Sequence, residues 1–427
     1  MINKIVELLK TNKNVSAYKV TKSTTYSVEL FYVTDKLETN RVTDTEAYDV
    51  VVYCDFAEYR GSSSFLVASS FTEEQIKEKI ELAVKRAKFV KNKFFELPKL
   101  EEKCVDIPSP ISGSSFKDVA CKTADAIFKA NVYKDGWINS VEIFVTEKSK
   151  RIVNSNGIDL ESTFADLYIE LIPTWRGEHE EVELYQNIET SEINYDDITA
   201  KVEETMLNAK ARANAVKLPA DLHKCNVILK SEEASMIFNY FKDELNYAVV
   251  YQHMNILNVG DMVNDINTSD PIDITLKPYV VGASKAQAFD DDGVVLKDCH
   301  IIDNSKCMKL HGNTRYGYYL GEKNPTGSYL NMEVKPGSMS YDEMKKEPHI
   351  LCVYFSSPQL DNYSGYYGGE VRLGFYFDGQ KYTPVTGFSI SGNIHKDKNK
   401  FRFSKEIETN RGYRGPKYIY VKDMTIN

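Results

Sequence analysis

The 427-residue sequence predicts an α+β fold with an N-terminal antiparallel sheet with packed helices and a C-terminal, mainly β, barrel-like domain. Two observations lead to this prediction. In the first half, long stretches of alternating apolar and polar residues are interrupted by segments with helical periodicity. In the second half, short apolar segments recur between turns rich in Gly, Asn and Asp, which is typical of barrels and sandwiches. A chain of this length also exceeds one ordinary core, so two domains are expected.

The first half is predicted to build one sheet covered by helices. Its clearest helix follows Thr72, which can form a capping box with Gln75 while Phe71 packs against Ile76. An Asn-Gly step at 156–157 is typical of a tight hairpin turn. The pattern predicts helices at 1–12, 73–92, 116–131 and 191–214, and strands at 15–32, 42–58, 137–146, 151–154, 160–173 and 180–184.

The segment 217–225 is the best candidate for a domain boundary, which gives domains spanning residues 1–216 and 217–427. After it, a strand at 226–229 leads into a helix. We expect Ser231 to cap this helix, and its apolar face recurs at steps of three and four residues. Further strands are predicted at 272–278, 294–302, 330–334, 349–355, 370–377, 381–391, 400–407 and 417–424, with one helical turn near 340–346.

The composition of the chain disfavours several classes of function. The net charge is −9 and no basic cluster is dense enough to follow a phosphate backbone, so direct binding of nucleic acid is disfavoured. No stretch approaches 18 uncharged apolar residues, so no membrane span is expected. The seven cysteines show no Cys-x-x-Cys spacing, which indicates reduced thiols. We therefore expect a cytoplasmic protein.

A series of turn motifs in the second half resembles the TldD/PmbA (TldE) family. Single motifs of this kind are common, and it is their order and spacing that carry the resemblance. They are Asp270-Pro271, the turn at 289–294, Gly312-Asn-Thr-Arg-Tyr-Gly317, the segment 330–337, Gly365-Tyr-Tyr-Gly-Gly369 and the segment 384–393. In the first half, Asn154-Ser-Asn-Gly157 and the segment from Arg60 to the following helix fit the same family.

The resemblance implies an N-terminal α+β domain, a C-terminal barrel-like domain and a dimer around a large central cavity. Catalytic members are zinc metallopeptidases with a His-Glu-x-x-x-His helix and a cysteine near the C-terminus. Histidine and thiolate hold the zinc, which acidifies a bound water for the glutamate to deprotonate. In this chain the aligned helix reads Phe238-Asn-Tyr-Phe-Lys-Asp-Glu244, with Asn239 and Tyr240 near the places of a ligand and the base.

Both parts of that zinc site are missing, because the helix has no histidine and the segment 408–415 has no cysteine. This matches the PmbA/TldE-like branch, whose members lack the metal, and older names call the pair a modulator of DNA gyrase. We therefore expect no cofactor, no metal and no catalytic residue.

The remaining polar groups are better explained as ordinary structural residues than as catalytic or metal-binding sites. His179-Glu180 is the one His-Glu pair, but Glu183 stands where a second histidine would be needed. The acidic run 290–293 lacks the alternating ligands and distal glutamate of a calcium loop. Glutamates 232 and 233 are better read as partners of a helix dipole than as a catalytic pair with Asp243 and Glu244. Cys299, His300, Cys307 and His311 match no metal-binding spacing, and a strand would point Cys299 and His300 to opposite faces.

The most site-like cluster that remains combines tyrosines, which offer rigid contact area, with glycines, which allow a close backbone approach. It could contact a peptide or form a subunit interface, and ordinary strand-and-turn chemistry explains it equally well. The cluster consists of Tyr363, Tyr366, Tyr367, Gly368 and Gly369.

Three hypotheses for function follow. The first is a non-catalytic, PmbA/TldE-like subunit that pairs with a TldD-like zinc peptidase in the proteolysis or maturation of small or unfolded peptides. The second is an active metallopeptidase or other hydrolase with unrecognised ligands. The third is a homodimeric, peptide-binding protein without an enzymatic partner. The first explains the missing histidines and cysteine best.

Overall fold

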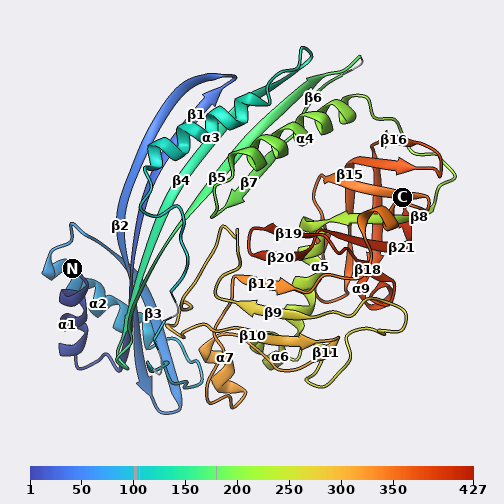
Figure 1. The fold of residues 1–427 in the computed structure, drawn as a ribbon. Coiled ribbons are helices and arrows are strands. Elements are labelled where there is room, and N and C mark those ends of the chain that lie inside the picture. The colour runs from blue at the N-terminus through green and yellow to red at the C-terminus, as the bar shows by residue number, and fades with distance from the viewer. Residues whose placement is uncertain (101–102, 105, 179) are drawn as a thin grey trace.

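The computed structural model describes residues 1–100, 103–104, 106–178 and 180–427, and it consists of two parts, each built on β-sheet (Figure 1). In the N-terminal part the helices are α1 (Ile2–Thr11), α2 (Glu73–Ala87), α3 (Phe116–Lys129) and α4 (Tyr195–Ala213). The strands are β1 (Ala17–Val33), β2 (Lys36–Phe56), β3 (Tyr59–Ala68), β4 (Gly136–Asn154), β5 (Asp159–Arg176), β6 (Glu181–Glu183) and β7 (Gln186–Thr190).

The N-terminal sheet is antiparallel, as predicted, with strand order β3-β2-β1-β4-β5-β6 and with β7 also paired to β5. Its long strands rise beside the C-terminal part and arch over it (Figure 1). Alternate residues of β1, β4 and β5 point to one face and form a core with α3 and α4. The first half of β1, with β2 and β3, forms a second core with α1 and α2. All four helices therefore cover the same face of the sheet.

Local signals predicted this part well. The capping box of α2 is present, with Thr72 accepting from the Gln75 amide while the Gln75 side chain accepts from the Thr72 amide. The helix ends at Ala87 instead of residue 92. The predicted strands at 137–146 and 151–154 are one strand, β4, and the hairpin around Gly157 joins it to β5.

The C-terminal part contains many short strands. Its helices are α5 (Ser231–Glu244), α6 (Tyr247–Tyr251), α7 (Thr314–Tyr319), α8 (Tyr341–Met344) and α9 (Ile394–Asp397). Its strands are β8 (Lys224–Lys230), β9 (Ile274–Lys277), β10 (Cys299–Asp303), β11 (Lys306–Cys307), β12 (Asn331–Val334), β13 (His349–Phe355), β14 (Gln359–Leu360), β15 (Tyr366–Phe377), β16 (Tyr382–Val385), β17 (Phe388–Asn393), β18 (Phe401–Phe403), β19 (Ile407–Asn410), β20 (Tyr413–Pro416) and β21 (Tyr418–Ile426).

Five of these strands close into a barrel, which confirms the predicted architecture. The order β13-β8-β21-β17-β15 closes because β15 also pairs with β13. A second sheet with the order β11-β10-β9-β12-β20-β19 lies beside the barrel. Helix α5 leaves the barrel at the end of β8 and packs between the two sheets, where its apolar face is buried in the largest core of the chain.

Several predicted boundaries in this part are wrong. Residues 294–298 are loop, because the chain there turns around the buried carboxylate of Asp290. The predicted strand at 381–391 is two strands, β16 and β17, separated at Gly387, which has a φ of 72°. The predicted strand at 400–407 is also two, β18 and the start of β19. Ser231 does not cap α5, because its hydroxyl donates to Glu408, at 2.6 Å from Oε2.

The acidic turn at 290–293 joins the two parts. Lys19 of β1 reaches Asp292 with an Nζ–Oδ1 distance of 2.9 Å, and Lys150 of β4 reaches Asp291 at 2.5 Å. Beneath these ion pairs, Ile152 and Phe289 belong to one small apolar cluster. An apolar cluster with residues from both parts, together with these two ion pairs, therefore holds the N-terminal sheet against the C-terminal part.

In the part of the chain that the structure describes, no helix is long and apolar enough to cross a membrane.

Candidate functional site

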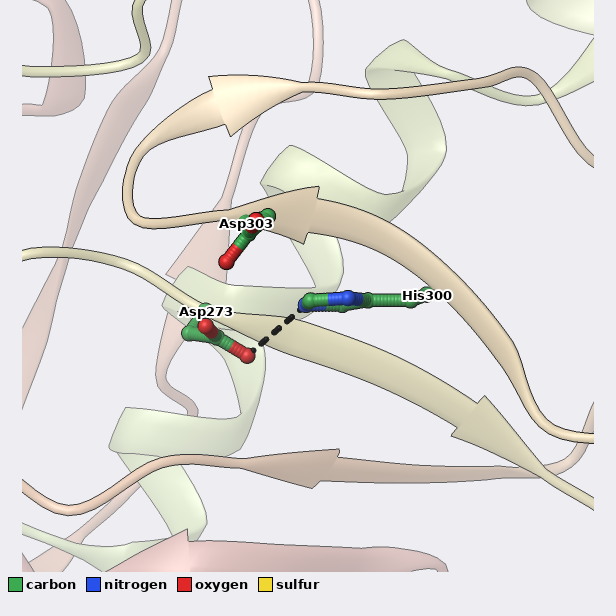
Figure 2. A group of neighbouring side chains, drawn as sticks. All are labelled: Asp273, His300 and Asp303. Carbon is green, nitrogen blue, oxygen red and sulfur yellow. Dashed lines mark hydrogen bonds and ion pairs between the residues drawn. The ribbon is translucent and has the colours of Figure 1, made fainter.

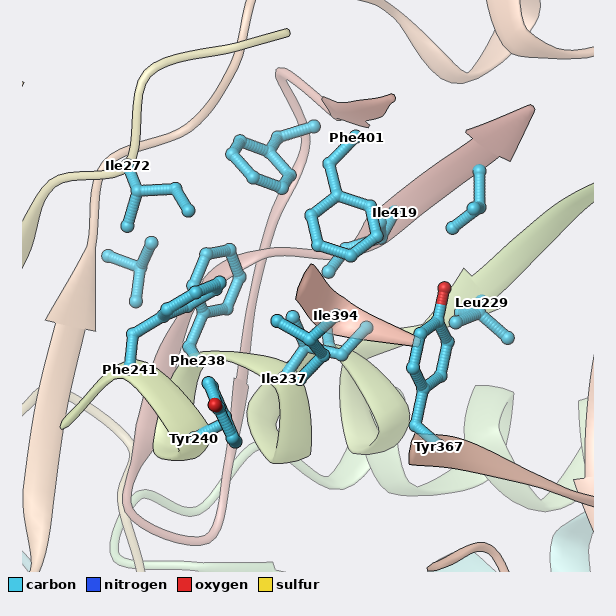
Figure 3. Packing of buried hydrophobic residues seen from close by; sticks show 14 of the residues in the cluster. Leu229, Ile237, Phe238, Tyr240, Phe241, Ile272, Tyr367, Ile394, Phe401 and Ile419 are labelled. Atoms are coloured by element: carbon cyan, nitrogen blue, oxygen red, sulfur yellow. The ribbon is translucent and has the colours of Figure 1, made fainter. Parts of the chain in front are cut away.

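The helix aligned with the family's zinc motif is α5, and it is packed by aromatic side chains (Figure 3). Phe238 is fully buried, and its ring centroid lies 5.1 Å from that of Phe403 and 6.0 Å from that of Tyr413. Phe241 and Tyr240 are also buried, at 1% and 2% exposure. Phe238 thus fills the space between α5 and strands β18 and β20, while the Tyr240 ring packs against Phe241 and against His395 of α9.

The polar groups of α5 are engaged elsewhere. Glu244 is buried and accepts backbone hydrogen bonds from Ile256 and Leu257, at 2.6 and 3.0 Å. Asp243 lies 3.4 Å from the amide nitrogen of Asn362, and burial raises the pKa of its carboxyl. Aromatic rings are not zinc ligands, and the carboxylates of α5 point to different neighbours, so the residues present do not fit the zinc of the catalytic relatives.

One group of side chains in the described residues has the spacing of a metal site, and it lies on β10 and on the residue that precedes β9 (Figure 2). It consists of Asp273, His300 and Asp303, whose possible ligand atoms lie within 4.8 Å of one another. His300 Nε2 is 2.9 Å from Asp273 Oδ1, and Lys335 Nζ is 2.6 Å from Asp273 Oδ2. Both oxygens of the buried Asp273 are therefore already paired, one with the His300 ring and the other with the Lys335 ammonium group.

The other histidines and cysteines of the predicted candidates do not join this group. Cys299 and Cys307 are buried, and His300 is half-exposed on the opposite face of β10 from Cys299, as the strand pattern predicted. His311 is buried, with Nε2 2.9 Å from the carbonyl oxygen of Lys242, and burial lowers its pKa to about 4. His179 lies outside the described residues.

A cavity of about 620 Å³ lies between the two parts of the chain, at the N-terminal end of α5. Glutamates, lysines and arginines line it, together with the outer edges of β7 and β19, which among the described residues pair only with β5 and β20, respectively. Arg411 of the segment after β19 crosses to Glu189 of β7, with an Nε–Oε1 distance of 3.0 Å. The lining comes from residues 182–189, 201–212, 230–233, 353–358, 372 and 408–411.

Glu233 is the most perturbed carboxyl of this cavity. It stands in the first turn of α5, at the predicted helix start, and burial together with Glu232 raises its pKa to about 8. Glu233 also borders a small apolar pocket formed with Met236, Tyr367 and Gly368. The cavity thus combines a carboxyl that can be protonated near neutral pH with a narrow apolar extension.

The tyrosine–glycine cluster divides into two kinds of residue. Tyr363 and Tyr366 are 69% and 53% exposed, whereas Tyr367 is buried and its hydroxyl donates to Asp397 at 3.3 Å. Gly368 and Gly369 lie in β15, and a Cβ atom on Gly368 would come within 2.2 Å of the Ile390 carbonyl oxygen. Close strand packing explains Gly368, and the contact role of Tyr363 and Tyr366 stays a prediction.

Sequence reasoning missed the cavity itself. Its segments are far apart in the chain, and the strands β7 and β19 that line it were not predicted as separate elements. The one local signal was Glu232-Glu233, and the sequence favoured an interaction of these glutamates with the helix dipole.

The comparisons with known proteins agree with this architecture. Residues 222–427 match the model of the PmbA/TldA metallopeptidase C-terminal domain. No curated protein sequence matches the chain significantly.

Solved structures of the same fold cover the whole chain. TldE from Thermococcus kodakarensis has a TM-score of 0.81 at 15% identity, with 100% of this chain and 99% of that one covered. A candidate DNA gyrase modulator from Bacteroides thetaiotaomicron gives 0.81 at 18% identity, covering 100% and 97%. One from Thermotoga maritima gives 0.80 at 15%, covering 100% and 99%. Residues 222–427 thus form a PmbA/TldA metallopeptidase C-terminal domain, and the whole chain shares the fold of these solved structures.

Proposed function

We propose that this chain is a non-catalytic, TldE-like subunit of a TldD/PmbA-type metallopeptidase complex, which holds small or unfolded peptides while a partner supplies the zinc. The observation that carries the proposal is the aromatic packing of α5, where Phe238 contacts Phe403 and Tyr413. A helix whose ligand positions are buried rings keeps its place in the core and cannot bind zinc.

The cavity beside α5 supports the peptide-holding part of the proposal. An extended peptide can add to an exposed sheet edge through main-chain hydrogen bonds, with side-chain pockets giving specificity. The outer edges of β7 and β19 border the cavity, and Tyr354 and Gln186 join its walls through a 3.0 Å hydrogen bond. The small apolar pocket at Met236 would take one side chain of such a peptide.

Reconstitution tests the proposal. The chain, a relative with the His-Glu-x-x-x-His helix, and their mixture are each assayed with an unstructured fluorogenic peptide. We expect cleavage and zinc in the mixture, with the zinc on the relative, and neither cleavage nor stoichiometric zinc with this chain alone. A chain that binds one zinc ion and cuts the peptide by itself would overturn the proposal.

A cavity-filling variant tests the peptide-holding role separately. Asn410 lines the cavity and makes no side-chain hydrogen bond in the described part of the chain, so Asn410→Trp should fill the space without losing one. It should lower peptide affinity and cleavage by the mixture. Leu66→Trp, at a position that is 68% exposed on β3, is the matched control and should change neither.

A further inference from the structure

The face of the N-terminal sheet opposite α3 and α4 carries a patch of carboxylates and aromatic rings, which we call the acid–aromatic face. Its members alternate with the core residues along three strands, so they point away from the helices. Strand register places Glu29 opposite Phe144 and Phe144 opposite Tyr168. The neighbouring row places Phe31 opposite Glu142 and Glu142 opposite Glu170. The face consists of Glu29, Phe31, Glu142, Phe144, Tyr168 and Glu170.

One end of this face already binds a cation from the chain itself. Arg41 of β2 donates from Nε to Glu29 Oε2, and its guanidinium carbon lies 5.3 Å from the centroid of the Phe31 ring. Thr43 donates to the other oxygen of Glu29, at 2.9 Å. A carboxylate and a neighbouring ring together therefore hold a guanidinium here, by an ion pair and a cation–π contact.

The other end has the same chemistry, and Arg41 acts on its Glu142 only through charge at a distance, without an ion pair in the described residues. Glu142 and Glu170 are directly opposite on β4 and β5, where like charges destabilise a strand pair. Within the described residues, Glu142 makes no hydrogen bond or ion pair. Glu170 accepts from the hydroxyls of Tyr168 and Tyr185, each at 2.9 Å. Burial and the charge of Glu170 raise the pKa of Glu142.

The rings needed to complete the site are in place. The Phe144 centroid lies 5.6 Å from that of Phe31 and 5.7 Å from that of Tyr168, so the three rings form a continuous strip beside the two glutamates. All three are half-buried, so part of each ring stays open to solvent. The strip repeats, beside Glu142, the ring-and-carboxylate pair that holds Arg41.

We propose that the acid–aromatic face binds a lysine or arginine side chain of an extended, basic peptide between Glu142 and Glu170. The face is continuous with the interdomain cavity, because Tyr185 and Glu189 belong to the cavity wall and Tyr168 is paired with Glu189. A peptide held in the cavity can thus reach the face with a flanking basic residue. The inference rests on the proposed function in taking the ligand to be a peptide, and it adds the charge that the peptide carries.

The test is a fluorescence-anisotropy titration of the full chain with two labelled, unstructured peptides of the same length. One carries three arginines and the other has glutamine at those positions. The first should bind at least about tenfold more tightly at low salt, and the difference should shrink as salt screens it. Glu142→Gln with Glu170→Gln should lower the affinity for the basic peptide about tenfold and leave that for the neutral peptide unchanged.

Glu74→Gln with Glu78→Gln is the matched control, since it removes the same charge from exposed positions of α2. It should leave both affinities unchanged. The Glu142/Glu170 variant should also keep or raise the Tm, because it relieves a like-charge pair, so weaker binding cannot come from unfolding.

Equal binding of the two peptides, or full binding of the basic peptide by the Glu142/Glu170 variant, would overturn the inference and leave the peptide-holding role standing. If neither peptide binds, the proposed function fails with it. If the variant instead dissociates a dimer in sedimentation velocity and binds the basic peptide normally, the face is a contact between copies and the inference is wrong.

Discussion

Replacing Phe238 by alanine tests the packing of α5 most sharply. The side chain is fully buried and contacts two other aromatic rings. Truncating a buried phenylalanine costs about 3–5 kcal/mol in transfer free energy and cavity formation, and loss of two ring pairs favours the upper end. Phe238→Leu keeps most of the volume and should cost roughly 1–2 kcal/mol.

Urea unfolding followed by two probes measures this loss. Both tryptophans, Trp137 and Trp175, lie on β4 and β5, so their fluorescence reports the N-terminal sheet, whereas far-UV circular dichroism reports the whole chain. Phe238→Ala should shift the circular-dichroism transition to lower urea. Asn239→Ala, at the neighbouring half-buried position, should stay within about 0.5 kcal/mol of wild type. A Phe238→Ala cost below about 1 kcal/mol would refute the tight packing of α5.

Three further predictions concern stability, each measured by urea unfolding. Burial raises the pKa of Asp166 to about 6, above about 3.9 in the unfolded chain, so its charge destabilises the fold above pH 6. Asp166→Asn should therefore stabilise by about 1–3 kcal/mol at pH 7.5 and by nothing at pH 4, and an equal effect at both values would contradict this. Thr72→Ala removes the capping box of α2 and should cost about 1 kcal/mol, whereas Thr72→Ser should cost little. Asp290 accepts three backbone N–H groups, and Asp290→Ala leaves all three without that acceptor, so it should cost about 1–3 kcal/mol, and an unchanged midpoint would show that the turn does not need them.

The parts of the fold that were predictable from sequence depend on neighbours in the chain. The α2 capping box joins residues three apart, and the apolar face of α5 follows from its own periodicity. The closed barrel follows from many short strands punctuated by turns. For α2 and α5 the residues that decide the structure lie within or directly beside one element, and for the barrel each strand and turn has its own local signal.

The errors have tertiary causes. Ser231 is a good capping residue, but Glu408, which is 177 positions away, takes its hydroxyl. Strand β2 begins at Lys36 instead of residue 42, because residues 36–46 are mostly exposed and show no apolar alternation. This segment is a strand because it pairs with β1, and its own sequence pattern does not indicate that pairing.

The candidate site, like the fold, was predictable from the sequence only where its signal is local. The absence of histidine on α5 could be read directly, because the zinc motif is local. The cavity and the acid–aromatic face could not, since each is assembled from segments on different strands. The pairing of Glu142 with Glu170, for example, is visible only once the register of β4 and β5 is known.

The metal content of the purified chain tests the central claim most directly. The chain is saturated with zinc, dialysed and analysed by atomic emission, beside a catalytic relative treated identically. Because buried rings replace the zinc ligands on α5, we predict well under one zinc ion per chain and one per chain in the relative. One tightly bound zinc ion in this chain, retained in the Asp273→Asn/His300→Gln variant, would contradict the account.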